Sequence, residues 1–211
     1  MINYDPKRHK YEFKGKEIES VTSYIKRFKN IDTYHLLMSK YKMSREDVIK
    51  AICKDDNEIS QEKAKWQKKS EEAMTKGSHI HDLIAKELKG EHQNDPMCDM
   101  VMNWIKDEEL EVVKVEEIIF SEKVYLAGTI DALFKTKNGK YLLVDWKTGG
   151  PIRAQSEVKM KPPYDKYDDC PMSHYYLQLN LYSQILQHLG YPIHRKLIVH
   201  VRESELSIYE E

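Results

Sequence analysis

The chain has 211 residues, which is enough for one domain with a sizeable hydrophobic core and argues against a second domain. Its 34 basic and 35 acidic residues leave a net charge of −1, so binding of nucleic acid would depend on a local basic patch. No stretch approaches the roughly 18 apolar residues of a membrane span, and the N-terminus lacks a signal-peptide core. We therefore expect a soluble intracellular protein, in a cytoplasm or an organelle matrix, with no membrane partner.

The cysteines Cys53, Cys98 and Cys170 are widely spaced and odd in number. They form no zinc-binding pattern. This use of cysteine is typical of a reducing compartment.

Residues 1–20 are expected to form a short polar lead, with a turn or hairpin at residues 13–16. A helix is then expected to start at Ser20-Val21-Thr22, because Ser or Thr can cap free backbone amides. Three basic residues follow on this helix, and they either contact phosphates or form a solvated face.

Residues 31–76 are highly charged and helical in pattern. Ser44, followed by Asp47, provides a second helix-capping signal in this region. Because no repeat or low-complexity linker separates it from the rest, we expect a helical subdomain or arch.

A long helix is expected from about Ser60 to Leu88, and it contains the stretch G-S-H-I-H-D. His79 and His81 lie about 200° apart around such a helix and cannot share one site. A histidine on a helix is more often a surface or core residue than a ligand. As a ligand, neutral imidazole suits Mn²⁺ better than Mg²⁺.

A loop and a packing helix are expected over residues 90–110, followed by a strand over residues 112–120. This strand is expected to pair antiparallel with residues 124–134. Its two adjacent glutamates are unusual in an apolar strand, and we expect either a functional role or a supporting one for Glu116, whereas Glu117 can face solvent.

Residues 126–149 have the pattern of two strands joined by a tight turn, because Asn138-Gly139 is a strong signal for a two-residue hairpin. Asp131 lies on the first strand, and Asp145 and Lys147 lie on one face of the second, opposite to Trp146. Two carboxylates can hold a hard divalent cation, and a nearby lysine can stabilise charge on a phosphate or position a water.

A long polar segment follows over residues 152–172. Segments of this length are usually functional or disordered. Tyr164 and Tyr167 offer stacking faces for bases, although surface tyrosines need no ligand.

A helix is expected over residues 173–189, with a core stripe of Leu177, Leu181, Ile185 and Leu189. Gln178 and Tyr182 are one turn apart on an adjacent face. A short apolar strand is expected over residues 196–201.

Four motifs occur in order along the chain: G-x-x-x-H at residues 77–81, G-x-x-D at 128–131, D-x-K at 145–147 and Q-x-x-x-Y at 178–182. Together they resemble the PD-(D/E)XK nuclease superfamily, in the RecB-like exonuclease branch that includes mitochondrial genome-maintenance and related phage nucleases. The resemblance implies an α/β fold with a restriction-endonuclease-like α-β-β-β-α-β core, in which helices flank a mixed central sheet. It also implies one nuclease domain over residues 1–211, with a helical N-terminal region or arch at 1–75 and a catalytic core at 76–211.

The resemblance assigns roles to individual residues. Metal ligands would be His81, Asp131, Asp145 and the carbonyl of Trp146. Catalytic residues would be Asp131, Asp145, Lys147 and Glu116. Substrate-binding residues would be Gln178, Tyr182, Thr148, Ser20, Thr22 and Lys161. The cofactor would be one or two Mg²⁺ or Mn²⁺ ions. The three cysteines cannot supply the four ligands of the iron–sulfur cluster that some RecB-like relatives carry.

The implied function is a divalent-metal-dependent deoxyribonuclease. It would be an exonuclease acting on free-ended DNA, either single-stranded or with overhangs, in replication, recombination or repair. Three alternatives remain open: an endonuclease of the same fold, an inactive nucleic-acid-binding accessory protein, and an interaction protein whose charged helices dock a partner.

Overall fold

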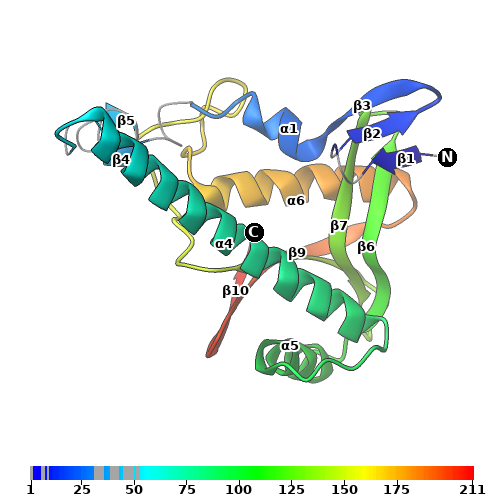
Figure 1. Ribbon diagram of the computed structural model, residues 1–211. Coiled ribbons are helices and arrows are strands. Elements are labelled where there is room, and N and C mark those ends of the chain that lie inside the picture. The colour runs from blue at the N-terminus through cyan, green and yellow to red at the C-terminus, as the bar shows by residue number, and fades with distance from the viewer. Residues whose placement is uncertain are drawn as a thin grey trace.

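The computed structural model describes residues 2–5, 8, 10–30, 36–38, 43–44, 50 and 53–211 (Figure 1). Its helices are α1 (Val21–Lys26), α4 (Asp56–Leu88), α5 (Pro96–Asp107) and α6 (Pro171–His188). Its strands are β1 (Ile2–Asp5), β2 (Lys10–Phe13), β3 (Lys16–Ser20), β4 (Leu36–Met38), β5 (Met43–Ser44), β6 (Glu111–Ser121), β7 (Leu126–Lys135), β8 (Tyr141–Thr148), β9 (Ile193–Arg202) and β10 (Glu205–Glu210).

An eight-stranded mixed sheet forms the centre of the fold, with strand order β1-β2-β3-β7-β8-β9-β10 and β6 paired to β7. β6, β7 and β8 are antiparallel neighbours, and β9 returns parallel to β8 after the crossover through α6. The predicted order of helix, three strands, helix and strand is therefore confirmed, with α5 and β10 added to it.

The sheet divides along one edge of β7. β8 pairs with β7 over residues 132–135, and β3 pairs with it at residues 126–127. Residues 128–131 lie between these two partners, and among the described strands none pairs with them on this edge. The resulting fork between β7 and β8 opens the sheet to side chains from both faces.

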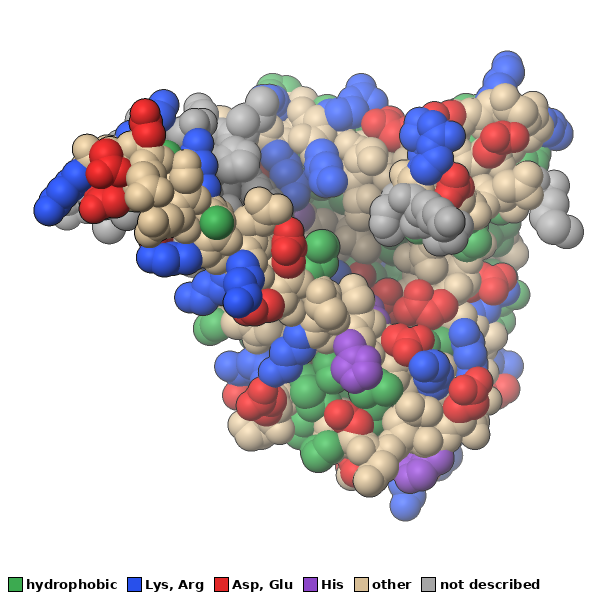
Figure 2. Space-filling view, viewed as in Figure 1, with side chains coloured by type: hydrophobic (Ala, Val, Ile, Leu, Met, Phe, Trp, Pro, Cys, Tyr) green, Lys and Arg blue, Asp and Glu red, His purple; other side chains and the backbone are tan. Residues whose placement is uncertain are grey.

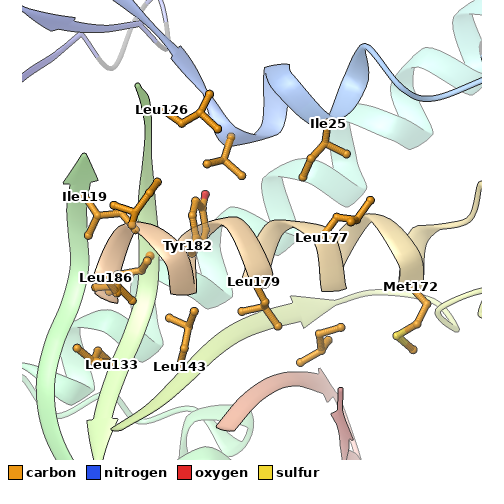
Figure 3. Close-up of a cluster of buried hydrophobic side chains, with 14 of the residues drawn as sticks. Ile25, Ile119, Leu126, Leu133, Leu143, Met172, Leu177, Leu179, Tyr182 and Leu186 are labelled. Carbon is orange, nitrogen blue, oxygen red and sulfur yellow. The ribbon is translucent and has the colours of Figure 1, made fainter. Parts of the chain in front are cut away.

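Helices cover both faces of the sheet. On one face, α6 packs Leu179 and Leu186 against β-strand residues such as Leu143, all of them buried (Figure 3). On the other face, α4 and α5 enclose a second core. Burial of each such side chain contributes about 1.5–3 kcal/mol. The two cores fix the sheet on which the fork lies.

The second core is centred on aromatic rings. Trp104 of α5, Phe134 of β7 and Trp146 of β8 meet edge to face, with ring centroids 6.1–6.5 Å apart. Trp146 thus faces away from Asp145 and Lys147, as strand alternation predicts. The burial of its indole anchors β8 directly beside those two residues.

α4 is the longest element, with 33 residues. It begins earlier than the predicted Ser60, because Asp55 caps the backbone amides of Asn57 and Glu58. Ile80 and Ile84 are buried near its C-terminal end, whereas most side chains before Gly77 are exposed. Figure 1 shows this N-terminal part extending beyond the sheet. Within the described residues, no helix is both long and apolar enough to cross a membrane.

The prediction of a helical region over residues 1–75 is wrong for its first part, which forms β1, β2 and β3. The turn predicted at residues 13–16 is confirmed, since it joins β2 to β3. Alternating apolar residues explain the strands, because Tyr11 and Ile18 are buried with Ala127 in a third small core. The predicted helix start is confirmed, with Ser20 accepting a hydrogen bond from the Ser23 amide at 3.0 Å.

Two short strands, β4 and β5, also lie where a helix was predicted. Ser44 ends β5, and its role as a helix cap stays a prediction because residues 45–49 lie outside the described residues. Asp47, the partner in that capping signal, lies outside the described residues. Among the described residues, the helical prediction for residues 31–76 is thus confirmed for α4 and contradicted at β4 and β5.

The β7–β8 hairpin differs from the prediction in its loop. The Thr136 amide donates to the Lys140 carbonyl at 2.9 Å, which leaves three loop residues, 137–139, and not two. The Gly139 amide in turn donates to the Thr136 carbonyl at 2.8 Å, and Gly139 has a φ of +75°. A turn closed by a left-handed glycine is the usual form of a three-residue hairpin.

The C-terminal elements correct two further predictions. Leu189 is 46% exposed because α6 ends at His188, so it does not continue the core stripe. β10 was not predicted, since its sequence E-L-S-I-Y-E is polar and pairs only along the edge of β9.

Candidate active site

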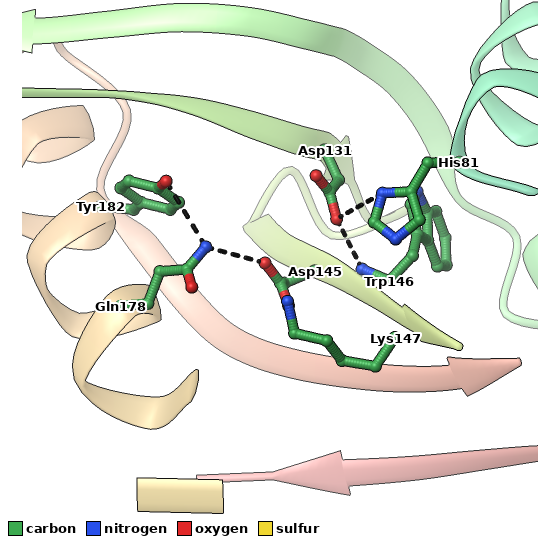
Figure 4. Close-up of polar contacts among 7 residues, drawn as sticks. All are labelled: His81, Asp131, Asp145, Trp146, Lys147, Gln178 and Tyr182. Carbon is green, nitrogen blue, oxygen red and sulfur yellow. Dashed lines mark hydrogen bonds and ion pairs between the residues drawn. The ribbon is translucent and has the colours of Figure 1, made fainter. Parts of the chain in front are cut away.

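Asp131 lies where β7 and β8 separate. Its Oδ2 accepts a hydrogen bond from the Trp146 backbone N–H at 2.8 Å, and His81 Nδ1 of α4 lies 3.5 Å from the same oxygen (Figure 4). The side chain of Asp131 therefore takes the place of a strand carbonyl as the partner of β8. This hydrogen bond therefore holds the Asp131 carboxylate at the point where β7 and β8 separate.

His81, Glu116 and Asp131 come together from α4, β6 and β7. Each offers one ligand atom, and these atoms all lie within 4.8 Å of one another. Glu116 has a φ of +49°, which is a strained conformation for a residue other than glycine. The strain occurs at a residue whose carboxylate joins this cluster.

The electrostatics of this acidic cluster favour a cation. Partial desolvation by the cavity walls and the charge of Asp131 raise the pKa of Glu116 to about 7, although its side chain is accessible to solvent. Burial would lower the pKa of His81, but its contact with Asp131 outweighs burial and raises it. A bound divalent ion would relieve the repulsion between the two carboxylates.

Asp145 and Lys147 project together from β8 on the α6 side of the fork. Lys147 Nζ lies 2.5 Å from Asp145 Oδ2, and Gln178 Nε2 of α6 donates to Asp145 Oδ1 at 3.1 Å (Figure 4). Burial raises the pKa of Asp145, with Lys147 opposing it. Burial would lower the pKa of Lys147, but Asp145 and Asp131 outweigh it and raise that pKa.

α6 supports this pair with three side chains on one face. Gln178 Nε2 also lies 3.4 Å from the Tyr182 hydroxyl, and Tyr182 is buried. Lys147 Nζ lies 4.4 Å from the centre of the Tyr175 ring, within the range of a cation–π interaction. The sequence analysis did not identify Tyr175, since nothing in its local pattern distinguishes it from the tyrosine beside it.

The motif glycines provide space for site residues. A Cβ at Gly128 would lie 2.4 Å from a ring carbon of Tyr182, so only glycine allows β7 to pass this ring. A Cβ at Gly77 would lie 2.9 Å from Thr148 Oγ1, so α4 approaches the end of β8 closely at this point.

A cavity of about 580 Å³ opens onto the acidic cluster. Its wall includes Gly77, His81, Asp82, Lys86, Lys89 and Glu116. Figure 2 shows this side of the molecule hollowed near its centre, with acidic side chains beside the hollow. Substrate can therefore reach the cluster from solvent.

The donor set fits a hard or borderline divalent cation, since it consists of carboxylate oxygens and one imidazole nitrogen. Asp145 Oδ2 is buried and lies 2.5 Å from Lys147 Nζ, so the chain itself already supplies a partner for this oxygen, and its role as a further metal ligand stays a prediction. Glu116, predicted as a catalytic residue, lies among the clustered ligand atoms. Asp145, predicted as a metal ligand, lies outside that cluster and pairs with Lys147. Trp146 contributes its N–H to Asp131, and its carbonyl as a ligand stays a prediction.

The other predicted residues occupy two places. Gln178, Tyr182 and Thr148 adjoin the fork, whereas Ser20 and Thr22 lie at the start of α1, with their hydroxyl oxygens 3.1 Å apart. The Lys161 amide donates to the Phe28 carbonyl at 2.8 Å. No described contact links Ser20, Thr22 or Lys161 to the acidic cluster, so their roles stay predictions.

The segment over residues 152–172 is packed against the domain. Met160 and Cys170 are buried, and the Tyr164 ring lies 5.0 Å from that of Phe28. Both Tyr164 and Tyr167 are half-buried, which reduces the faces they could offer to bases. His79 is exposed on α4, in accord with its exclusion from the site.

Comparison with known proteins identifies a family for this chain. The crystal structure of SSO0001 is similar over 54% of this chain and 47% of that chain, with 19% sequence identity and a TM-score of 0.31. The aligned part thus spans about half the length of SSO0001. No curated protein matches the sequence. The sequence profile of the PD-(D/E)XK nuclease superfamily matches residues 32–207, which include the whole acidic cluster, and the chain therefore belongs to this superfamily.

Proposed function

We propose that the chain is a divalent-metal-dependent deoxyribonuclease of the RecB-like branch, and that it degrades DNA from free ends. One observation carries the nuclease assignment. His81, Glu116 and Asp131 converge within 4.8 Å at a fork whose other side holds the Asp145–Lys147 pair. Membership of the superfamily supports a nuclease that acts on nucleic acid with the aid of divalent ions.

His81, Glu116, Asp131 and Asp145 are the residues that would hold Mg²⁺ or Mn²⁺. When bound, the ion would supply Lewis-acid stabilisation of the phosphate and a lowered pKa of water. The chain's own contribution is to hold these donors in place through the Trp146 amide and Gln178. Such preorganisation avoids reorganisation during the reaction.

Lys147 has a separate role in this proposal. Its ammonium is held between the Asp145 carboxylate and the Tyr175 ring, at 2.5 Å and 4.4 Å. An ammonium fixed in this way can neutralise charge that develops on a phosphate oxygen and can orient the attacking water. Gln178 hydrogen-bonds the Asp145 carboxylate, and Tyr182 hydrogen-bonds Gln178, so that Asp145 is held beside Lys147.

Charge around α1 supports the binding of a DNA strand near the site. The Lys161 amide contact with Phe28 brings the 152–172 segment beside α1, so that Lys26 and Lys161 belong to one region. Both are exposed and have no ion-pair partner within the described residues. Figure 2 shows Lys and Arg side chains above the hollow. Such cations can follow a phosphate backbone toward the site.

End-labelled DNA tests this proposal. Linear single-stranded, linear double-stranded and covalently closed circular single-stranded DNA are incubated with Mg²⁺ or Mn²⁺, and products are resolved by size. We expect degradation of linear DNA, with single strands and overhangs cut faster than blunt duplex, and no cutting of circles. The Asp145→Asn protein serves as the inactive control.

Cutting of closed circles at the rate of linear strands would show an endonuclease and defeat only the preference for ends. No cutting of any DNA with either metal, by protein that still binds DNA, would instead favour an accessory protein. We also expect DNA binding to weaken steeply with salt, because the contacts come from a local patch of cations.

A further inference from the structure

A second cavity, of about 430 Å³, lies at the carboxyl ends of the parallel strands β8 and β9. Gly77 contributes to its wall as well as to that of the first cavity. Thr148 also lines it and directly follows Lys147 in β8. Ligands in open α/β sheets commonly bind outside the carboxyl ends of parallel strands. This cavity thus adjoins the first cavity through Gly77, whereas Thr148 and the proposed reacting Lys147 are consecutive in β8 and point to opposite faces of the sheet.

The inner part of this cavity is apolar. Ile80 of α4, Met97 of α5 and Val201 of β9 line it. Ile80 and Met97 keep small exposed fractions, 4% and 7%, whereas Val201 is fully buried beneath the cavity wall. The small apolar surface of the two helices suits contact with one edge or face of a weakly polar group such as a nucleobase. The volume is also within the usual range for small-ligand sites.

The rim of this cavity carries two cations with replaceable partners. Lys76 pairs with Glu203 and Arg202 pairs with Glu205, each at 2.5 Å. The glutamate side chains are 79% and 56% exposed, so these ion pairs contribute little and can exchange for another anion. In addition, Arg202 Nε is buried and has no hydrogen-bond partner among the described residues. A phosphate would satisfy this donor.

We propose that this second cavity binds one nucleotide, with its base on the apolar surface and its phosphate on Arg202 and Lys76. The proposal deepens the proposed function, on which it rests for the identity of the ligand. The nucleotide is either a unit of the bound strand next to the scissile phosphate or the released nucleoside monophosphate. Both sources share the chemistry of a base joined to a phosphate.

Binding is measured by calorimetry on the full-length protein in EDTA, which prevents cleavage and removes metal-mediated phosphate binding. The probes are thymidine 5′-monophosphate, thymidine, inorganic phosphate and a short single-stranded oligothymidylate. We expect the monophosphate or the oligonucleotide to bind at least about tenfold more tightly than thymidine or phosphate alone, because base and phosphate act together.

Arg195 provides a matched control for Arg202. Both arginines lie on β9, both side chains are 34% exposed, and each pairs with a glutamate of β10. Arg195 lies at the opposite end of the strand and does not line the cavity. Arg202→Gln should weaken nucleotide binding about tenfold or more, whereas Arg195→Gln should leave it within about twofold. Lys76→Gln should cause a smaller loss, because Lys76 is more exposed.

The outcomes separate this inference from the proposed function. Tight binding of the monophosphate identifies a product site, and tight binding of the oligonucleotide alone identifies a site for a unit within the strand. Equal affinities for the Arg202→Gln and Arg195→Gln proteins, or phosphate binding as tight as the monophosphate, would overturn the inference even if the protein cuts DNA. Arg202-dependent nucleotide binding without any nuclease activity would refute the proposed function and retain the cavity as a nucleotide site.

Discussion

The two sides of the fork between β7 and β8 differ in how their charges are balanced. On the β7 side, Glu116 and Asp131 gather around His81, and among the described residues neither carboxylate forms an ion pair with a lysine or arginine. On the β8 side, Asp145 is matched by Lys147 at 2.5 Å and is held by Gln178. The carboxylates of one side thus have only an imidazole as a close partner among the described residues, whereas the other side contains its own ammonium–carboxylate pair.

This difference suggests a division of labour. The β7 side has the properties of a ligand-binding site, since it concentrates acceptors and strains Glu116 to do so. The β8 side has the properties of a preorganised catalytic group, since its geometry is fixed by contacts with α6. The predictions below test whether the two sides can be separated by experiment.

The largest effect is expected where the two sides meet. Asp131→Asn and Asp145→Asn should each lower kcat by about 1000-fold or more, because each removes a charge that would hold the metal. The Asp131→Asn protein should still fold, because its amide oxygen can accept the Trp146 N–H bond. Turnover is measured with excess Mn²⁺, with thermal unfolding as the control for folding. Near-normal turnover in either protein would contradict the site.

Lys147→Ala should separate the two sides. We expect a loss of about 100- to 1000-fold in kcat, on the scale of removing one preorganised electrostatic contact. Metal affinity should change much less, because Lys147 is not a ligand and the acidic cluster keeps its donors. Calorimetric titration with Mn²⁺ checks this. If affinity disappears together with activity, Lys147 has a structural role in holding Asp145.

The sequence predicted the sheet better than its surroundings. Strands β6 to β9 were predicted because each combines an apolar run with a turn or helix at its end. For β1 to β3 the sequence predicted no more than a turn or hairpin at residues 13–16, since their short alternating patterns are interrupted by charges, and their burial depends on β7. β4, β5 and β10 are polar or very short, and only pairing with a neighbour defines them.

The sequence predicted which residues belong to the site but not how they are arranged in space. Asp131, Asp145 and Lys147 stood out because buried strands seldom carry charges. The fork that separates them depends on which strand pairs along each part of β7, and local sequence does not encode that choice. The strained backbone of Glu116 likewise depends on its surroundings, although two glutamates in an apolar strand were a signal.

The third prediction compares two donors within the β7 side. His81→Ala should weaken Mn²⁺ by about tenfold and Mg²⁺ by less, because imidazole is a borderline ligand and Mg²⁺ prefers oxygen. Glu116→Gln should weaken both ions to a similar extent, because it removes a carboxylate charge. Metal titrations of both proteins give the four affinities. Equal effects of His81→Ala on the two ions would place His81 outside the coordination sphere.

Gly128→Ala tests whether the β8 side depends on close packing with β7. Its Cβ would lie 2.4 Å from the ring of Tyr182, which is only 4% exposed and cannot move outward. We expect a loss of about 1–3 kcal/mol in the free energy of unfolding, as for an overpacked core. Gly77→Ala is the matched comparison. It should lower the free energy of unfolding by less, because the Thr148 side chain can rotate away from the added Cβ.

A second substitution shows whether the Tyr182 ring is the cause. Tyr182→Leu should partly relieve the cost of Gly128→Ala, and a double-mutant cycle of unfolding free energies measures the coupling. Additive free energies would mean that the strain lies elsewhere in β7.

The smallest effect is expected at Tyr175, which touches Lys147 through its ring. Tyr175→Leu should lower kcat about threefold to tenfold, because a cation–π contact contributes about 0.5–1 kcal/mol or somewhat more when desolvated. Tyr175→Phe retains the ring and should lose less. Because the ring contacts Lys147 and offers no metal ligand, metal affinity should stay unchanged in both proteins.

The split between these two substitutions decides the role of the ring. A loss in kcat that is larger for leucine than for phenylalanine, at constant Mn²⁺ affinity, places Tyr175 with Lys147 on the catalytic side of the fork. Equal losses would assign the effect to the hydroxyl and not to the ring face 4.4 Å from the ammonium. A fall in metal affinity would show that the β7 and β8 sides are coupled through α6, which would break the division of labour between them.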